Sequence, residues 1–508
     1  MSTEIDLAPG TGAAPDTSIN AAPTRREIRS VLTGLMIVMG LAAIDQSIVA
    51  TALPRIIAEF GGVAHLSWVV TAYVLASTAT MPLYGKLSDQ YGRKPALYAA
   101  ILLFLLGSIL SGLSQSLMQL IAFRAVQGLG AGGLLPLTQI IMGDLVPPAQ
   151  RGRRQGSIAA VYAVCSVVGP LAGGIITDLL SWHWIFYANL PIGAVALYAI
   201  GRALHHTPPL RARRIDYVGA VLLTSSTTAC LLVLALGGSE WAWNSARIAA
   251  CGALAAALGV AFVLHARRTP EPVLPLALFH DRLFVIACVV LAFTFMGLLG
   301  SSLFFPLYFQ TVEGISPAHS GFLTGPLMVG VVVSSIFNGR VLLRGGRYKP
   351  AQIAGLALAT LAFAVLAACV ASAQPLVMVE PAIIAVGLGL GLIMPNMTIA
   401  VQNALPASHR GVGTATLAFF RSLGGLVGVT GAGAILASKL RHSAVPQLAS
   451  VSAHSAGIAH GVATAIYRHA IAGVFATGAG IIAIALGFIL FLPELPLRTH
   501  PHPNDTSA

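Results

Sequence analysis

Long apolar stretches are the feature of this sequence that most constrains its fold. Fourteen of them follow one another between Val31 and Leu492, each close to the roughly 20 residues that a helix needs to cross a bilayer. Only 9% of all residues are charged, whereas a soluble domain carries about 25%. Because lipid offers the backbone no hydrogen-bond partners, these stretches predict an all-α membrane protein. The predicted spans are residues 31–53, 67–86, 95–114, 117–141, 156–178, 183–203, 215–237, 247–265, 283–311, 318–340, 350–372, 376–400, 411–436 and 469–492.

The distribution of Arg and Lys predicts the orientation of these spans. An even number of spans places both ends of the chain on the same side of the membrane. Of the 29 basic residues, 22 fall on that side and 5 on the opposite side. Because cytoplasmic loops carry the excess of Lys and Arg, we expect both termini to be cytoplasmic, in a multi-pass protein of the bacterial cytoplasmic membrane.

Several classes of function lack their sequence signals. The net charge of +12 follows from the predicted orientation, so no nucleic-acid partner is expected. No GxxxxGK[ST], HExxH or GxSxG motif occurs, so neither ATP hydrolysis nor enzymatic activity is predicted, and no cofactor is expected. The cysteines stand singly inside apolar runs, which indicates packing residues without a disulfide framework or a metal site. They are Cys165, Cys230, Cys251, Cys288 and Cys369.

Two pairs of loops on the predicted cytoplasmic side repeat along the chain. "GKLSDQYGRKP", residues 85–95, matches "GRVLLRGGRYKP", residues 339–350, and "PPAQRG" ending at Gly152 matches "PASHRG" ending at Gly411. Parallel repeats are typical of the two halves of a transporter. The expected parts are a disordered cytoplasmic tail at 1–30, an N-terminal six-helix half at 31–203, an inserted two-helix segment at 204–281, a C-terminal six-helix half at 282–492 and a cytoplasmic tail at 493–508.

Two charged residues lie deep inside predicted spans. Asp45 is about 14 residues from the start of the first span and Arg124 about 7 residues from the external start of the fourth, so at about 1.5 Å per residue both lie about 10 Å below the external face. Either charge alone in lipid costs at least a few kcal/mol, so opposite charges at matching depth indicate a pair that faces a shared cavity. The pair is either a static link between two helices or a titratable site that exchanges a proton, a cationic substrate or both.

Further residues are candidates for the wall of a substrate cavity. Arg421 lies near the middle of the thirteenth span, where it could line the cavity, contact the substrate or pair with Asp45. Phe305 and Tyr308 belong to an aromatic set in the ninth span, for which contact with lipid or core is the more common arrangement. Glu380, near the outer end of the twelfth span, can extend its carboxylate into water.

Four stretches resemble the motifs of one family. They are "LAAIDQSIVATALP" in the first span, "GKLSDQYGRK" after the second, "AFRAVQGLGAGG" in the fourth and "GSIAAVYAVCSVVGPLAGG" in the fifth. Together they are similar to the motifs of the major facilitator superfamily, and in particular of its fourteen-span drug:proton antiporters. The resemblance covers nearly the whole chain after residue 30. It implies a major facilitator fold with two six-helix halves and two inserted transmembrane helices.

The resemblance also implies roles for two motifs. After the second span it implies a latch between the halves, formed by Gly85, Asp89, Gly92 and Arg93, whereas a charged turn that obeys the positive-inside rule is the simpler alternative. In the fifth span it implies conformational switching by a face of small residues, which is also compatible with plain helix packing. This face consists of Gly169, Pro170, Gly173 and Gly174, and Cys165 nearby departs from the family pattern, which has glycine or another very small residue there.

The predicted function is secondary active transport across the cell membrane by alternating access. We expect a proton-coupled exporter of amphipathic drugs or toxic compounds, of the multidrug efflux type that gives antibiotic resistance. A proton-coupled exporter of one endogenous metabolite is the alternative. The expected partners are the lipid bilayer, protons and a small-molecule substrate, and the sequence leaves open whether a periplasmic adaptor binds.

The orientation of the spans is directly testable. A reporter protein fused after Ala508 should be active in the cytoplasm, and one inserted near Ser450 should be active outside. The measurement is the activity of paired reporters that fold on only one side of the membrane. An external C-terminus would overturn both the orientation and the even number of spans.

Overall fold

The computed structural model describes residues 25–60, 67–146, 148–203, 216–238, 241–302, 304–315, 317–340, 347–441 and 456–496. Nearly all of them are helical. The first helix begins at Arg25, six residues before the predicted first span. Most of the predicted N-terminal tail, the end of the C-terminal tail, residues 341–346 of the second repeated loop and the loop around Ser450 lie outside the described residues.

Along the chain, the helices form two groups that are separated in sequence by a pair of helices. The first group is α1 (Arg25–Phe60), α2 (Ser67–Tyr91), α3 (Arg93–Gly112), α4 (Leu117–Leu145), α5 (Pro148–Leu179), α6 (His183–Tyr187) and α7 (Asn189–Ala203). The pair is α8 (Tyr217–Leu236) and α9 (Ala246–Arg268). The second group is η2 (Leu276–His280), α10 (Arg282–Ser302), α11 (Phe304–Thr311), α12 (Pro317–Arg340), α13 (Lys349–Ala371), α14 (Leu376–Ala404), α15 (Ala407–Arg441) and α17 (Ala456–Leu490).

Helices occupy all fourteen predicted spans. Within the described residues, twelve are long and apolar enough to cross a membrane. The spans predicted at 183–203 and 283–311 each consist of two consecutive helices, α6 with α7 and α10 with α11. The spans predicted at 67–86 and 156–178 are helical as α2 and α5 but are not among the twelve. Helix α2 carries polar side chains that face a cavity between the halves, which lowers its apolar content.

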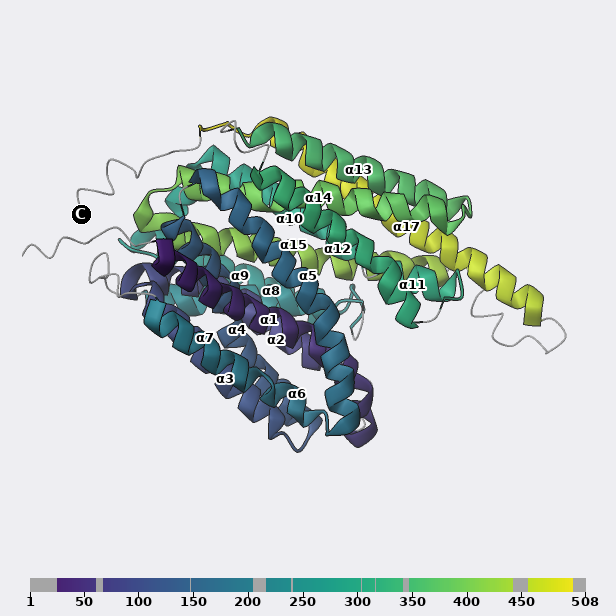
Figure 1. Ribbon diagram of the computed structural model, residues 1–508, viewed down its shortest axis with the longest axis horizontal. Coiled ribbons are helices and arrows are strands. Elements are labelled where there is room, and N and C mark those ends of the chain that lie inside the picture. The colour runs from purple at the N-terminus through teal and green to yellow at the C-terminus, as the bar shows by residue number, and fades with distance from the viewer. Residues whose placement is uncertain are drawn as a thin grey trace, which may run out of the picture.

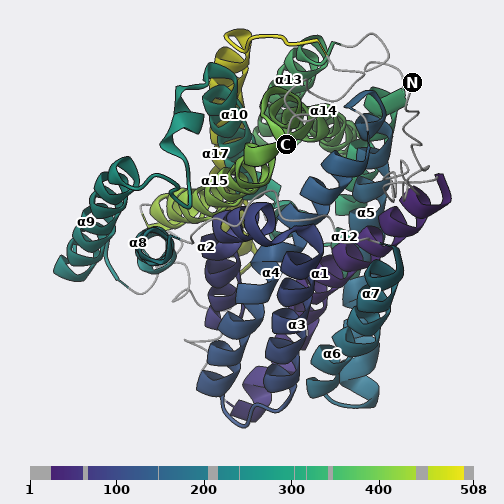
Figure 2. The ribbon, with the colours of Figure 1, turned by 90° about the vertical axis from the view of Figure 1, so that its left-hand side faces the viewer.

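The two groups are the N-terminal and C-terminal halves of one bundle. Helix α2 packs against α15, and α5 packs against α12, so two seams join the halves. Figure 1 shows the halves in contact at the end where α1 begins and α17 ends, and spread apart at the other. We name these the termini end and the far end. Figure 2 shows α8 and α9 beside the bundle, with α9 outermost, and α8 contacts α2 and α15.

Glycines in α4 let this helix approach its neighbours closely. A Cβ atom on Gly128 would lie 2.5 Å from the carbonyl oxygen of Tyr73 in α2, and one on Gly130 would collide with the backbone nitrogen of Phe104 in α3. Without a hydrophobic driving force between helices in lipid, such close packing is a main source of helix association. It fixes α4 between α2 and α3, and with it the position of Arg124.

Enlarging Gly130 should therefore destabilise the N-terminal half. We expect Gly130→Leu to lower the free energy of unfolding by about 1–3 kcal/mol or more, because the added side chain forces α3 and α4 apart. Gly252→Leu in α9 is the matched control, since a Cβ atom there would meet no described atom within 4 Å. The measurement is thermal unfolding of the purified proteins in detergent. Equal melting temperatures for the two variants would contradict this account of α4.

Candidate functional site

A buried cluster of charged and polar groups surrounds Asp45. Its carboxylate accepts a hydrogen bond from Nη1 of Arg124 at 3.0 Å, from Nε2 of Gln127 at 2.8 Å and from Nδ2 of Asn189 at 2.8 Å. Asp45 is 0% exposed and Arg124 is 1% exposed. The predicted pair therefore exists in the structure, with three donors on the carboxylate. Such contacts offset the cost of a charge without water.

Further contacts orient these donors. Arg124 Nη1 also donates to Oε1 of Gln127 at 2.7 Å, and Asn189 Nδ2 also donates to Oγ of Ser108 at 2.9 Å. Sequence reasoning missed Gln127 and Asn189. Gln127 follows Arg124 by three residues, so its place on the same face of α4 was a usable signal. Asn189 begins α7 after a short helix and carries no comparable signal.

A cavity of about 460 Å³ lies between the two halves. Its wall comes from α1, α2 and α4 on one side and from α10, α12, α14 and α15 on the other. Most lining side chains are apolar, and four of the chain's 11 methionines are among them. These four are Met39, Met81, Met328 and Met394. Arg421 is the one residue with a formal charge among the described lining residues.

Tyr73 connects the cavity with the Asp45 cluster. The guanidinium carbon of Arg124 lies 4.2 Å from the centre of the Tyr73 ring, a cation–π contact, and Tyr73 also lines the cavity. Gln46, the residue after Asp45, lines the cavity as well. The charged cluster is thus separate from the cavity, and Tyr73 is in contact with both.

Of the residues that the sequence offered as candidates for the cavity wall, one lines the cavity and the others lie elsewhere. Arg421 lines the cavity, with its guanidinium carbon 5.3 Å from the centre of the Phe295 ring. Asp45 and Arg124 are not lining residues of this cavity. Phe305 and Tyr308 are each 1% exposed and lie in the core of the C-terminal half, where Phe305 packs against Phe475 and Tyr308 donates to Glu313.

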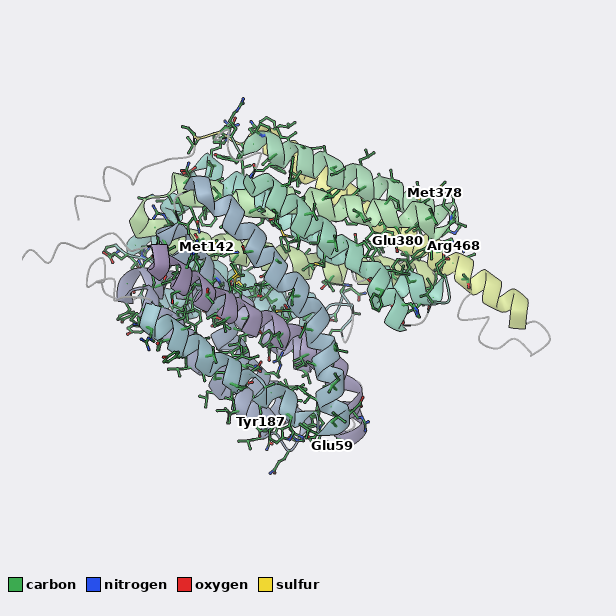
Figure 3. All side chains as sticks on the ribbon, viewed as in Figure 1. Glu59, Met142, Tyr187, Met378, Glu380 and Arg468 are labelled. Carbon is green, nitrogen blue, oxygen red and sulfur yellow. The ribbon has the colours of Figure 1, made fainter. Side chains whose placement is uncertain are left out.

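Figure 3 places Glu380 with Arg468 at the far end of the C-terminal half. In the same figure Glu59 and Tyr187 lie at the far end of the N-terminal half, and Met142 lies toward the termini end. Glu380 is therefore remote from the residues that join the halves. Among the described residues, no group of three or more His, Cys, Asp or Glu side chains is placed to hold a metal ion.

The loop motif lies where the halves meet at the termini end. Asp89 accepts hydrogen bonds from Arg93 and, at 3.0 Å, from the backbone N–H of Val412 in α15. Arg93 also donates through Nε to Asp144 at 2.8 Å, and Asp144 accepts from Arg410 at 3.2 Å. Two carboxylates of the N-terminal half thus bind donors of the C-terminal half.

Glycines shape this latch. Gly92 has a φ of 93°, a conformation that side chains rarely adopt, and it makes the sharp turn between α2 and α3. A Cβ atom on Gly85 would lie 2.6 Å from Cβ of Ala415, so α2 and α15 touch at this point. Nε2 of Gln402 donates a hydrogen bond to the carbonyl oxygen of Gln139 at 3.1 Å, which adds a contact between the halves at a residue that also lines the cavity.

The small-residue face of α5 packs on α1 in part. A Cβ atom on Gly169 would collide with Oγ of Ser47, which also donates to the carbonyl oxygen of Cys165 at 3.2 Å. Gly173 is buried, and a Cβ atom on Gly174 would meet no described atom within 4 Å. The side chain of Pro170 lies outside the described set.

Comparison with known proteins identifies the family. Residues 35–429 match the model of the Major Facilitator Superfamily, and the chain belongs to this superfamily of membrane transporters. The chain is 35% identical over 433 residues to the multidrug transporter protein MdtP of Bacillus subtilis strain 168, which covers 84% of this chain and 80% of that protein. It is 37% identical over 404 residues to multidrug resistance protein 3 of the same strain, covering 79% of this chain and 78% of that protein.

Solved structures show the same fold. The proton:xylose symporter XylE superposes with a TM-score of 0.64 over 93% of this chain and 98% of that one, at 14% sequence identity. The all-helical major facilitator fold, with two halves around a central cavity, is therefore that of this protein. The family consists of transporters that move small-molecule substrates through the membrane.

Weakening the latch should slow transport without loss of protein. We expect Asp89→Asn to reduce the transport rate about tenfold or more, because a hydrogen bond to a charged group contributes about 1.5–3 kcal/mol and about 1.4 kcal/mol changes an equilibrium tenfold. The measurement is the initial rate at matched membrane abundance.

Asp178→Asn is the matched control for the latch variant. Asp178 pairs with Arg55 at 3.4 Å, and the two side chains are 71% and 63% exposed, so this surface pair contributes little. The control should transport at the wild-type rate. A wild-type rate for Asp89→Asn as well would leave the loop as a charged turn only.

Proposed function

We propose that this protein is a proton-coupled antiporter that exports a range of amphipathic compounds from the cytoplasm, as a multidrug efflux transporter. The single observation that carries the proposal is the large, mostly apolar cavity between the halves, next to a buried carboxylate. The names of the two Bacillus subtilis relatives, a multidrug transporter and a multidrug resistance protein, favour the same reading.

The composition of the cavity favours broad specificity. Methionine is unbranched and polarizable, and its side chain adapts to ligands of different shape. Four methionines, two from each half, therefore suit a site that accepts several apolar ligands, as flexible Met-rich surfaces do in promiscuous binders. A site for one metabolite would need convergent polar groups that read its hydrogen bonds.

Asp45 is the proposed proton carrier. Uptake of a proton by its carboxylate would remove the negative charge that Arg124 balances, and the guanidinium would then be held by Gln127 and the ring of Tyr73. Because Tyr73 also lines the cavity, a rearrangement of Arg124 reaches the substrate site through one side chain. This provides a physical link between proton loading and substrate binding.

The free energy released by one proton moving inward is sufficient to drive export. A proton that moves inward across about 100 mV releases about 2.3 kcal/mol, and one pH unit adds about 1.36 kcal/mol. The sum of about 3.7 kcal/mol supports a roughly 500-fold gradient of a neutral solute. One titrating aspartate is therefore enough for useful drug efflux.

The proposed arrangement in the membrane is fourteen spans with both termini cytoplasmic. The pair α8 and α9 then supplies the two inserted spans between six-span halves. In this orientation the latch faces the cytoplasm, and the spread halves face outward. The structure would then represent the state that releases substrate outside.

Removing the carboxylate tests the proton-carrying role. We expect Asp45→Asn to reach the membrane in normal amounts and to lose uphill export driven by a pH gradient, because the amide keeps the size and one oxygen that can accept from Gln127 and Asn189 but cannot ionise. The measurement is proton-coupled uptake into inverted vesicles, normalised to the protein present. Full proton-coupled transport by this variant would refute the proposal that Asp45 carries the proton.

The double variant Asp45→Asn with Arg124→Gln distinguishes a static ion pair. If the pair only stabilises the fold, Asp45→Asn leaves Arg124 buried without its counterion, at a typical cost of about 3–5 kcal/mol, and the double variant restores abundance and coupling. We expect no restoration of coupling. Testing several unrelated compounds in the same assay separates multidrug export from export of one metabolite.

A further inference from the structure

The orientation of the Asn189 side chain depends on the charge of Asp45. Its Nδ2 donates one hydrogen to Oδ1 of Asp45 at 2.8 Å and the other to Oγ of Ser108 at 2.9 Å. An ionised carboxylate only accepts hydrogen bonds, so it must face the amide nitrogen and not the amide oxygen. A proton on Oδ1 of Asp45 would turn this oxygen into a donor that faces a second donor.

We propose that the Asn189 side chain reverses when Asp45 takes up its proton. Half a turn about the Cβ–Cγ bond exchanges Nδ2 and Oδ1, and the amide oxygen then accepts from the protonated carboxyl group. Asn189 is thus a positioning residue that stabilises Asp45 in both protonation states. This rests on the proposed function in one respect, that Asp45 carries the proton. It goes beyond that function because it names the side chain that responds to the proton.

The proton belongs on the oxygen that faces Asn189. Among the described residues near Asp45, Arg124 of α4 contacts its Oδ2, and the ring centre of Tyr73 of α2 lies 4.2 Å from the guanidinium carbon. Cys165 of α5 packs on α1, where its carbonyl oxygen accepts from Ser47. The contacts from α3 and α7 are neutral. A guanidinium group disfavours a proton on the oxygen that it contacts, so Oδ1 is the site of protonation.

The other two partners of Asp45 are unable to reverse in this way. Arg124 has donors only and no acceptor. Gln127 donates through Nε2 to Asp45 at 2.8 Å, but its Oε1 accepts from Nη1 of Arg124 at 2.7 Å. A reversal of Gln127 would place its amino group against the guanidinium group. Asn189 is therefore the partner that can offer an acceptor to the new proton.

The amide oxygen of Asn189 is suited to this role. Asn189 is 1% exposed, and its buried Oδ1 accepts no hydrogen bond from any described residue. Reversal therefore breaks no described hydrogen bond to Oδ1, and it brings Nδ2 to the position that Oδ1 now occupies. In either orientation one amide atom lacks a described partner. The two orientations thus differ mainly in their contacts with Asp45 and Ser108.

Ser108 can match either orientation of the amide. Its Oγ accepts from Asn189 and, at 3.4 Å, from Gln127, while its hydroxyl donates to the carbonyl oxygen of Phe186 at 2.8 Å. A hydroxyl group rotates and can donate as well as accept. After the reversal Ser108 can donate to Oδ1 of Asn189, which has one lone pair for this hydroxyl and one for the protonated Asp45.

The reversal carries the protonation of Asp45 to helices outside the cavity wall. Ser108 lies in α3, Phe186 in α6, and Asn189 begins α7. When the Ser108 hydroxyl turns to Asn189, the hydrogen bond between α3 and α6 is lost. Proton uptake on α1 therefore loosens the packing of α3 on α6.

Infrared difference spectroscopy of the full-length protein in lipid tests the proposal. Asparagine with a heavy carbon isotope in its side-chain carbonyl separates these bands from the backbone bands, and spectra are compared with Asp45 ionised and protonated. We expect protonation to lower the stretching frequency of the Asn189 carbonyl, because this carbonyl then accepts a hydrogen bond. An unchanged or higher frequency would overturn the proposal, since an amide that remains a donor gains no hydrogen bond on its oxygen.

Variants assign the infrared bands. The carboxylic acid band that appears on protonation should vanish in Asp45→Asn, and the shifting asparagine band should vanish in Asn189→Ser. Asn396→Ser is the matched control, since Asn396 is also fully buried but pairs with Asn338, so the shifting band should persist there. A shifting asparagine band that survives in Asn189→Ser would overturn the assignment to Asn189.

Transport distinguishes a positioning role from packing alone. Asn189→Leu keeps a side chain of similar volume without a donor or an acceptor, whereas Asn189→Ser keeps a hydroxyl group that can act as both. We expect the serine variant to export against a gradient about tenfold faster than the leucine variant, with equal rates of downhill exchange. Equal rates of uphill export would overturn the positioning role. If the leucine variant fails to fold, the carbonyl shift of the wild-type protein decides.

The same spectra separate this inference from the proposed function. If no carboxylic acid band of Asp45 appears at any pH at which the protein is folded, proton carriage by Asp45 is refuted and the reversal with it. If the Asp45 band appears without a fall in the Asn189 carbonyl frequency, the reversal alone is refuted and Asp45 remains the proposed carrier.

Discussion

The central constraint on this protein is that a carboxylate without water needs fixed partners. Asp45 obtains them from α4 and α7, and α4 can present Arg124 and Gln127 because its glycines let α2 and α3 approach. The interior of the C-terminal half has a neutral contact between α12 and α14, from Asn338 to Asn396 at 2.9 Å. The buried ion pair of Asp45 with Arg124 therefore belongs to the N-terminal half, and the proposed proton carrier lies there.

The contact between the halves is suited to repeated breaking. At the termini end it consists largely of charged side chains and hydrogen bonds, such as Asp144 with Arg410 and Asp89 with the backbone of α15. Such groups would regain hydration if the halves separated. The free-energy cost of separation would therefore be much smaller than the strength of the intact contacts suggests. A purely apolar seam would expose surface to water and would favour one state too strongly. The mostly apolar wall belongs to the cavity, which is the proposed substrate site.

The sequence predicted the features that depend on the local run of residues, namely the helices and the depth of a charged residue within a span. Hydropathy located the helices, and the depth of Asp45 and Arg124 within their spans paired them. The sequence left open whether Phe305 and Tyr308 line the cavity or contact lipid or core, and both lie in the core of the C-terminal half. A membrane helix is apolar all round, so its hydrophobic pattern does not distinguish faces toward lipid, core or cavity. Asn189 was missed because the break between α6 and α7 depends on tertiary contacts, such as that of Ser108 with the carbonyl oxygen of Phe186.

The two seams between the halves differ in their surroundings, because α8 lies beside one of them. It contacts both α2 and α15, the helices that the latch joins, whereas α5 and α12 meet on the opposite side of the bundle (Figure 2). A compound dissolved in the hydrocarbon layer that approaches the first seam meets α8 before it reaches the halves. Any lateral entry from the lipid would therefore have to pass α8 at the first seam, whereas at the seam between α5 and α12 it would meet the halves directly.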